Sequence, residues 1–175
     1  MMNQHLEKSK FTNPSKQFFM ALKLKRKDEM TEADIKQLVD INKIVDLTVA
    51  YTWIIDHGPR EKLKEIFTDD ATFIIDVRHL NGIEAIINKI EGTLGRLSAS
   101  QHIISNHQVT INGDTATSNC YLHAQHTLLG TEGGDNYVLA GRYLDKLIRT
   151  DSGWRITERK LGLDWIEGNP KVVGR

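Results

Sequence analysis

Apolar and polar positions follow two different spacings, helical in the first half of the chain and strand-like in the second. In the first half, apolar side chains recur every three or four positions over residues 34–57 and 83–94, which predicts two amphipathic helices. Gly58 ends the first of them. Pro59 then opens a second, short helix over residues 60–67, at the position where its missing N–H costs nothing, and the helix over residues 83–94 is the third in chain order.

Strand signals occur once before the second long helix and dominate everything after residue 98. Residues 71–77 are rich in β-forming side chains. Four longer strands follow, separated by turns rich in Gly, Asp and Asn: residues 102–111, 115–129, 136–150 and 154–165. A typical strand has only about five or six residues, and long antiparallel strands twist and bulge. We therefore expect an α+β fold in which helices cover the concave face of a curled antiparallel sheet.

One domain, residues 33–168, carries all of these predicted elements, and its flanks differ from it in composition. Residues 1–32 are largely polar and contain a basic cluster over residues 23–27, which predicts a flexible, basic N-terminal extension. A contact of this extension with a partner subunit or a lipid surface is the alternative, and Met30 could be the natural start. Residues 169–175 are assigned to a C-terminal tail.

Composition argues against several classes of partner. The 23 basic and 23 acidic residues cancel, so nothing indicates nucleic acid or an anionic membrane. No apolar run approaches the roughly 18 residues that a membrane span needs. The single cysteine, Cys120, excludes an internal disulfide framework and fits a reducing compartment. These features predict a cytoplasmic protein without nucleic-acid or membrane partners.

A carboxylate and a histidine, far apart in the sequence, are the leading candidates for chemistry. At about 100° per residue, Tyr51 and Asp56 lie on the two flanks of the apolar stripe of the first helix, where a carboxylate is costly unless it is paired. His102, at the start of the first long strand, is the best candidate partner. Neutral imidazole suits the removal of a carbon-bound proton, and a carboxylate on its other nitrogen would fix its tautomer. The alternative is a hydrogen-bonded structural histidine and a helix-end aspartate.

The order of the predicted elements and several motifs along them match a known group. The motifs are Tyr51 to Asp56, EKLKEIFTDDA at residues 61–71, Gln101-His102, NGDTA at residues 112–116, GRY at residues 141–143 with Asp145, and DSGWRI at residues 151–156 with Arg159. From residue 34 to about residue 168, the chain resembles a SnoaL-like domain of the nuclear transport factor 2-like superfamily. It is most similar to the branch of scytalone dehydratase, hexachlorocyclohexane dehydrochlorinase and bile-acid dehydratase. The resemblance implies a cone-shaped sheet with a deep apolar pocket closed by the three helices.

The resemblance also implies roles for individual residues. These enzymes use an Asp near the end of the first long helix with a His on the strand after the third helix, which here are Asp56 and His102. Tyr51 matches a polar pocket position, and Arg159 matches an arginine that some members place in the pocket. Both would stabilise a leaving group or a developing enolate. Gln125 stands where bile-acid dehydratase carries a further carboxylate, so that enzyme's substrate is not implied here.

The strand over residues 115–129 supplies further substrate contacts if the face that carries Gln125 looks inward. Tyr121 and His123 share that face. Phe73 of the first strand completes the expected substrate-binding set. A polar row facing an oligomer interface is the alternative for His123.

Metal sites are not predicted from the remaining histidines. His102 and His107 are five positions apart, and His123 and His126 are three apart. Odd spacings put side chains on opposite faces of a regular strand, so neither pair can chelate one ion without a bulge. Cys120 has no thiol partner. The chemistry expected of Asp56 and His102 needs neither a metal nor an organic cofactor.

The sequence therefore predicts a cofactor-independent lyase or isomerase that acts on a small, mostly apolar or aromatic-derived molecule. His102 would be the general base, Asp56 its orienting partner, and Tyr51 and Arg159 the electrostatic helpers. One alternative is a non-catalytic module that binds a ligand in the same pocket. Another is a structural partner such as the small subunit of a ring-hydroxylating dioxygenase. The superfamily resemblance implies a homodimer or homotrimer.

Overall fold

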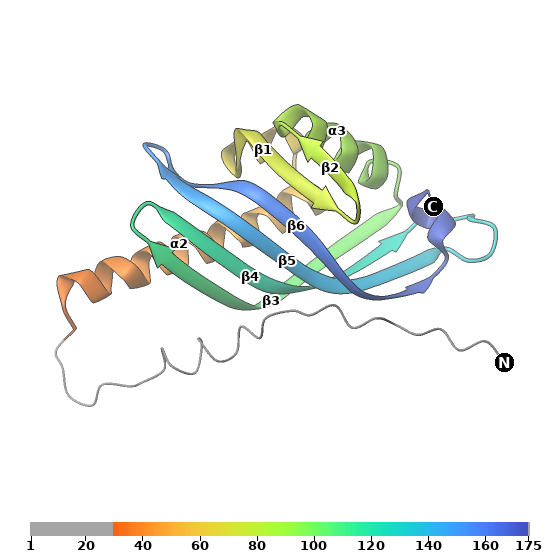
Figure 1. The fold of residues 1–175 in the computed structure, drawn as a ribbon. Helices are drawn as coiled ribbons and strands as arrows, with labels where there is room; N and C mark the ends of the chain where they lie inside the picture. The colour runs from red at the N-terminus through yellow and green to blue at the C-terminus, as the bar shows by residue number, and fades with distance from the viewer. Residues whose placement is uncertain (1–29, 175) are drawn as a thin grey trace. The chain divides into compact units, whose positions relative to one another are not determined.

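Helices precede a long-stranded sheet in the computed structural model, which describes residues 30–174 (Figure 1). The helices are α2 (Glu32–His57), the 3-10 helix η1 (Arg60–Glu65), α3 (Ile83–Leu94) and the 3-10 helix η2 (Pro170–Val173). The strands are β1 (Phe67–Ile75), β2 (Arg78–Asn81), β3 (Ala99–Asn112), β4 (Thr115–Thr127), β5 (Asn136–Thr150) and β6 (Gly153–Gly168). Residues 1–29, most of the predicted N-terminal extension, lie outside the described residues, so that prediction and the question of Met30 as a start stay open.

The strands form one sheet in the order β2-β1-β6-β5-β4-β3. The α+β class is confirmed, but the sheet is mixed, because β1 runs parallel to β6 while all other neighbours are antiparallel. A parallel pair needs a long connection, and here α3 and four strands intervene between β1 and β6. The sheet stays open, since β2 and β3 are its edges.

Irregular pairing lets the long strands bend around the helices. The register of β3 against β4 shifts between Ser105 and Gln108, where Asn106 adopts a φ of 56°. β5 and β6 shift at Gly141, where an added Cβ would collide with the carbonyl oxygen of Gly162. Bulges of this kind increase local twist and allow a sheet to curl.

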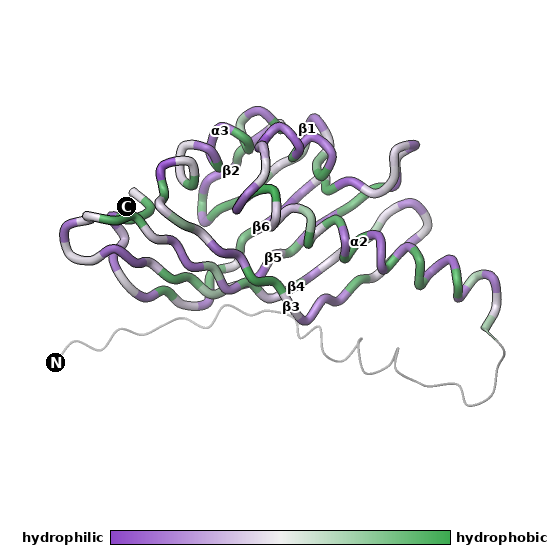
Figure 2. Tube along the Cα trace, turned by 180° about the vertical axis from the view of Figure 1, so that it is seen from behind, coloured by the Kyte–Doolittle hydropathy of each residue, from purple (hydrophilic) through white to green (hydrophobic). Residues whose placement is uncertain are grey.

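The core lies between the sheet and the helices packed on it. Figure 2, seen from behind, shows α2 crossing in front of the sheet. Ile44 and Ile55 of its apolar stripe are almost fully buried. α3 buries Ile86 and Ile90, whose regular spacing predicted this helix with its observed bounds. Both stripes join one cluster with inward-facing residues of β4 such as Leu122.

Two segments differ from the sequence predictions in a way that matters for the site. β2 was not predicted, because three of its four residues are exposed and give no alternation. Residues 169–174 are not a tail apart from the domain: η2 buries Val172 completely, and Arg96 donates a hydrogen bond to the Val172 carbonyl at 3.0 Å. No helix in the described part of the chain is long and apolar enough to cross a membrane.

Candidate active site

Asp56 and His102 meet where the last turn of α2 packs against the start of β3. Nδ1 of the His102 ring lies 2.7 Å from Oδ1 of Asp56. Both side chains are almost fully buried, at 6% and 7% exposure. An ionised carboxylate can only accept, so Nδ1 carries the proton of this hydrogen bond and Nε2 is left for the cavity. This arrangement supplies an oriented imidazole of the kind that general-base chemistry requires.

Three donors from one strand hold the Asp56 carboxylate. Besides the ring, the His102 backbone N–H donates to Oδ2 at 2.7 Å, and the Ser100 hydroxyl donates to Oδ1 at 2.8 Å. Burial alone would raise the pKa of Asp56, but the hydrogen bonds from His102 and Ser100 and the charge of the imidazolium outweigh it and lower that pKa. Asp56 therefore stays ionised beside His102 near neutral pH.

The local sequence explains why Asp56 points at β3. Gly58 ends α2, and its N–H donates to the Ile54 carbonyl at 3.0 Å. Arg60 then donates to the Ile54 carbonyl at 3.0 Å and to the Gly58 carbonyl at 2.8 Å. A cation on the last carbonyls of a helix satisfies acceptors that have no partner within the helix. The end of α2 is thus fixed within one turn of Asp56.

The His102 ring borders a cavity of about 150 Å³ between the sheet, α2, α3 and η2. Comparable volumes accommodate one benzene-sized ring. The walls are mainly apolar or aromatic: Tyr51, Ile55, Phe73, Ile75, Ile90, Leu94, Leu122, Tyr137, Leu139, Tyr143, Leu161 and Val173. Phe73 is among them, while its role as a substrate contact stays a prediction. Val173 of η2 and the following Gly174 line the cavity, so the C-terminal segment forms part of its wall.

A second histidine, His126 on β4, lines the same cavity and was not predicted as a site residue. Its ring centroid lies 5.2 Å from that of His102, edge to face. Burial, together with the positive charge available to His102, lowers the pKa of His126 to about 4. His126 is therefore neutral near neutral pH.

The prediction that the Gln125 face of β4 looks inward is wrong. Leu122 and His126 point into the cavity, whereas Tyr121, His123 and Gln125 lie on the outer face of the sheet, with Tyr121 54% exposed. The alternation of apolar residues along β4 decides which face points inward, because the row of side chains that includes Leu122 must be buried. His123 packs against Trp165 of β6, with ring centroids 5.8 Å apart. An oligomer contact through this outer row stays a prediction.

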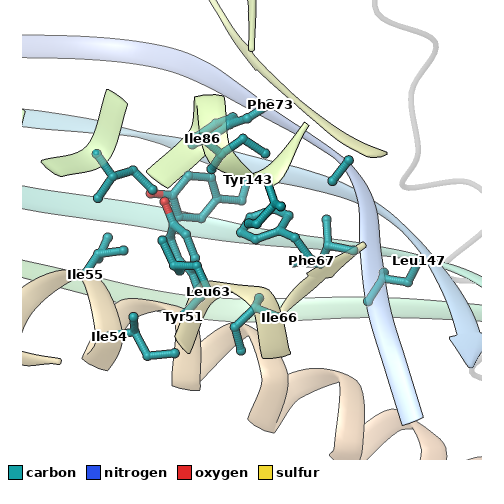
Figure 3. Close-up of a cluster of buried hydrophobic side chains, with 14 of the residues drawn as sticks. Tyr51, Ile54, Ile55, Leu63, Ile66, Phe67, Phe73, Ile86, Tyr143 and Leu147 are labelled. Carbon is teal, nitrogen blue, oxygen red and sulfur yellow. The ribbon is translucent and has the colours of Figure 1, made fainter. Parts of the chain in front are cut away.

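Tyr51 and Tyr143 form an aromatic pair at the buried end of the cavity. Their ring centroids are 5.7 Å apart, edge to face, and Figure 3 shows their hydroxyl oxygens close together. Burial raises the pKa of Tyr51 and raises that of Tyr143 well above its ordinary value. Both phenols therefore remain protonated and can donate hydrogen bonds.

Arg159 does not line the cavity, contrary to its expected role as a pocket helper. It is fully buried, and it donates to both carboxylate oxygens of Asp145, at 2.8 and 2.7 Å. Burial alone would lower the pKa of Arg159, but Asp145 outweighs this and raises it. The guanidinium stacks at 4.1 Å on Tyr51 and at 4.2 Å on Tyr143. Arg159 thus packs against the two tyrosine rings and does not line the cavity.

In the described part of the chain, the side chains that could bind a metal do not form a cluster. Within residues 30–174, no group of three or more His, Cys, Asp or Glu could hold a metal ion. The β3 bulge turns His107 inward, but its Nε2 lies 3.0 Å from the Thr48 hydroxyl on α2. Burial raises the pKa of Cys120 to about 11, so this thiol stays protonated.

Comparison with known proteins agrees with this architecture. The model of the SnoaL-like domain matches residues 36–160. The chain belongs to the SnoaL-like family. An uncharacterized protein from Mycobacterium tuberculosis is 32% identical over 130 residues, which are 71% of this chain and 86% of that protein.

Solved structures confirm that this SnoaL-like chain has the nuclear transport factor 2-like fold: a protein of that superfamily from Salmonella enterica, 18% identical, has a TM-score of 0.67 over 74% of this chain and 94% of its own. A protein from Kribbella flavida is 25% identical, with a TM-score of 0.74 over 79% of this chain and 99% of its own. A candidate scytalone dehydratase from Novosphingobium aromaticivorans is 20% identical, with a TM-score of 0.70 over 76% and 89% of the two chains. A hexachlorocyclohexane dehydrochlorinase from Novosphingobium barchaimii is 18% identical, with a TM-score of 0.69 over 78% and 94%. The last two likenesses concern the fold alone.

Proposed function

We propose that this SnoaL-like protein is a lyase of the dehydratase type that needs no cofactor and acts on a small, mostly apolar molecule. The observation that carries the proposal is the buried His102 ring, which borders an apolar cavity while its Nδ1 is held at 2.7 Å by Asp56. The structural neighbours named as a candidate scytalone dehydratase and a dehydrochlorinase support elimination as the reaction class.

The proton and the electrons can be followed through one turnover. Nε2 of His102 takes a proton from a carbon next to a carbonyl, and the C–H electron pair becomes a C=C bond. The leaving group departs from the next carbon with its bonding electrons. The imidazolium then gives the proton to the leaving group, so hydroxide leaves as water or chloride as hydrogen chloride. Return of the proton to another carbon would instead give an isomerisation.

Each buried group has a separate task in this scheme. Asp56 holds the ring and stabilises the imidazolium, as a carboxylate does for a histidine base. His126 stays neutral, so it does not compete with His102 for the proton. Tyr51 and Tyr143 can donate to the substrate carbonyl as negative charge develops on its oxygen.

A single-ring β-hydroxy ketone, 3-hydroxycyclohexanone, tests the proposal. Loss of water gives 2-cyclohexenone, which absorbs in the ultraviolet, and exchange of the C2 protons in D₂O reports proton abstraction by itself. We expect His102→Gln to lower both rates by about 10²- to 10⁴-fold, the usual contribution of a positioned base. Asp56→Asn should lower them as well, because the ring loses its fixed orientation.

His123→Gln is the matched control, since it removes an exposed histidine from the outer face of the same strand as His126. The control should keep wild-type rates. Equal elimination and exchange rates in wild type and His102→Gln would refute the proposal. Binding of the ketone without turnover would favour the alternative of a non-catalytic binding module.

A further inference from the structure

The last part of β6 runs on beyond the strand that flanks it. β1 pairs with β6 as far as Leu161, and from Gly162 onward β5 is the only strand beside β6 in the described part of the chain (Figure 1). Leu161 lines the cavity that the His102 ring borders. The inner face of residues 162–168 thus continues the strand face that forms the cavity wall.

Two large apolar side chains lie on this inner face. Leu163 follows two positions after Leu161, and alternation along a strand puts both on the same side. Ile166 pairs with Leu139, which also lines the cavity. Leu163 and Ile166 are nevertheless about half exposed, at 47% and 49%. They extend the apolar cavity wall into solvent.

A bulge in β6 keeps both side chains on the inner face. Asp164 is the extra residue, because its two neighbours pair with adjacent residues of β5. Regular alternation from Leu163 would turn Trp165 inward and Ile166 outward. With the bulge, Trp165 packs against His123 on the outer face and Ile166 turns inward. The bulge therefore lengthens the apolar strip formed by Leu163 and Ile166.

The size and chemistry of the cavity indicate what covers the strip. Its volume of about 150 Å³ holds one ring, so any larger ligand must extend past Leu161. His102 and the two phenols supply the polar contacts inside the cavity, whereas the side chains of Leu163 and Ile166 offer no hydrogen bond. The part of a ligand that reaches the strip is therefore apolar.

We propose that the substrate carries an unbranched apolar chain on its ring, with the ring in the cavity and the chain along Leu163 and Ile166. This inference rests on the proposed function, because it concerns the same site, and it narrows the substrate to ring compounds with an alkyl chain. Leu161 and Leu163 are about 7 Å apart along the strand, so a chain of about five carbons spans the strip. Covering the strip removes apolar surface from water and adds affinity.

Cyclohexanones with a methyl, propyl or pentyl chain at C4 are matched probes, because they share the ring and the carbonyl and have no leaving group. Calorimetric titration of the full chain should show about twofold tighter binding per added CH₂, since complete burial of one CH₂ is worth about fourfold and the strip covers a chain from one side. The pentyl compound has four more CH₂ groups than the methyl compound and should bind about 16-fold more tightly.

Substitutions in the strip test the assignment. In Leu163→Thr/Ile166→Thr, whose new side chains still suit a strand, the pentyl-to-methyl affinity ratio should fall to about two- or threefold, with methyl affinity unchanged. Ile103→Thr is the matched control, because Ile103 is 52% exposed on the outer face and does not line the cavity. It should keep the wild-type ratio. Nuclear Overhauser contacts from the end of the pentyl chain to the Leu163 and Ile166 methyl groups would locate the chain.

Failure of this inference can be told from failure of the proposed function. His102→Gln should keep the pentyl-to-methyl ratio, since binding of the chain does not need proton transfer. The same ratio in wild type and the double variant would overturn the inference whatever the enzyme activity. If the double variant also sedimented as a smaller species, a second copy of the chain would be the occupant of the strip. Chain-dependent binding without any turnover would uphold the inference and refute the proposed elimination.

Discussion

Acidification should destabilise this domain through His126. The folded state holds the pKa of His126 at about 4, against 6.5 for an ordinary histidine, because the ring is buried beside His102. Between these two values the unfolded chain binds a proton that the folded chain does not. Stability is therefore full above about pH 6.5 and falls as the pH drops toward 4, with no further loss from this group below it.

The shift of about 2.5 pKa units corresponds to about 3 kcal/mol in total, at 1.36 kcal/mol per unit. About 2 kcal/mol of this should be lost between pH 7 and pH 5. The side chain is only 3% exposed, so solvent screening reduces the effect little. His126→Gln keeps a polar side chain that cannot take up the proton, and the loss between the two pH values should shrink by about 2 kcal/mol in this variant.

Urea unfolding at pH 7, 6 and 5, followed by tryptophan fluorescence, measures this difference, because Trp154 is buried in the folded state. His79→Gln is the control, since His79 is exposed on β2 and should leave the pH dependence unchanged. His107, whose pKa burial also lowers, is present in all three proteins and cancels in the comparison. The same pH dependence in wild type and His126→Gln would refute the reasoning.

The remaining predictions concern two ion pairs away from the His102 ring. Asp40 accepts two hydrogen bonds from Arg149, at 2.8 and 2.7 Å, and Arg149 lowers the pKa of Asp40 to about 2. Asp40→Asn should lower the free energy of urea unfolding by about 1–3 kcal/mol, from pH 7 down to pH 4; an unaltered unfolding curve would contradict this. Arg159→Leu should cost about 3–5 kcal/mol, because Asp145 is left charged and buried, and the double variant Arg159→Leu/Asp145→Leu should recover part of that loss. Equal stability of the single and double variants would argue against the pair.

Local sequence patterns predicted most of the helices and strands. They failed where the pairing of strands decides which side chains are buried or lie opposite one another. The regular apolar spacing in α3 and the turns flanking β5 predicted both elements with their observed bounds. On β4, alternation alone would have placed Leu122 and His126 inside, and the weight given to Gln125 led to the wrong face. The pairing of Arg159 with Asp145 depends on their being opposite one another on β6 and β5, which no local pattern reveals.

The contact between Asp56 and His102 could be predicted from the sequence for a physical reason. A carboxylate beside the apolar stripe of a helix needs a partner, and His102 followed at the position that the family resemblance implied. Ser100 was not predicted as a third donor, because a serine two residues before a histidine gives no signal of its own. The exposed β2 strand, which brings Arg78 to the cavity, was not predicted because its residues show no hydrophobic periodicity.

The tautomer of the neutral His102 ring tests the central claim most directly. Two-bond ¹⁵N–¹H correlation spectra of the ¹⁵N-labelled protein above neutral pH distinguish a proton on Nδ1 from one on Nε2, and His102→Gln identifies the signals. We predict a proton on Nδ1, facing Asp56, and an unprotonated Nε2 in the cavity, with this preference lost in Asp56→Asn. A ring protonated on Nε2 in the wild-type protein would contradict its role as the base.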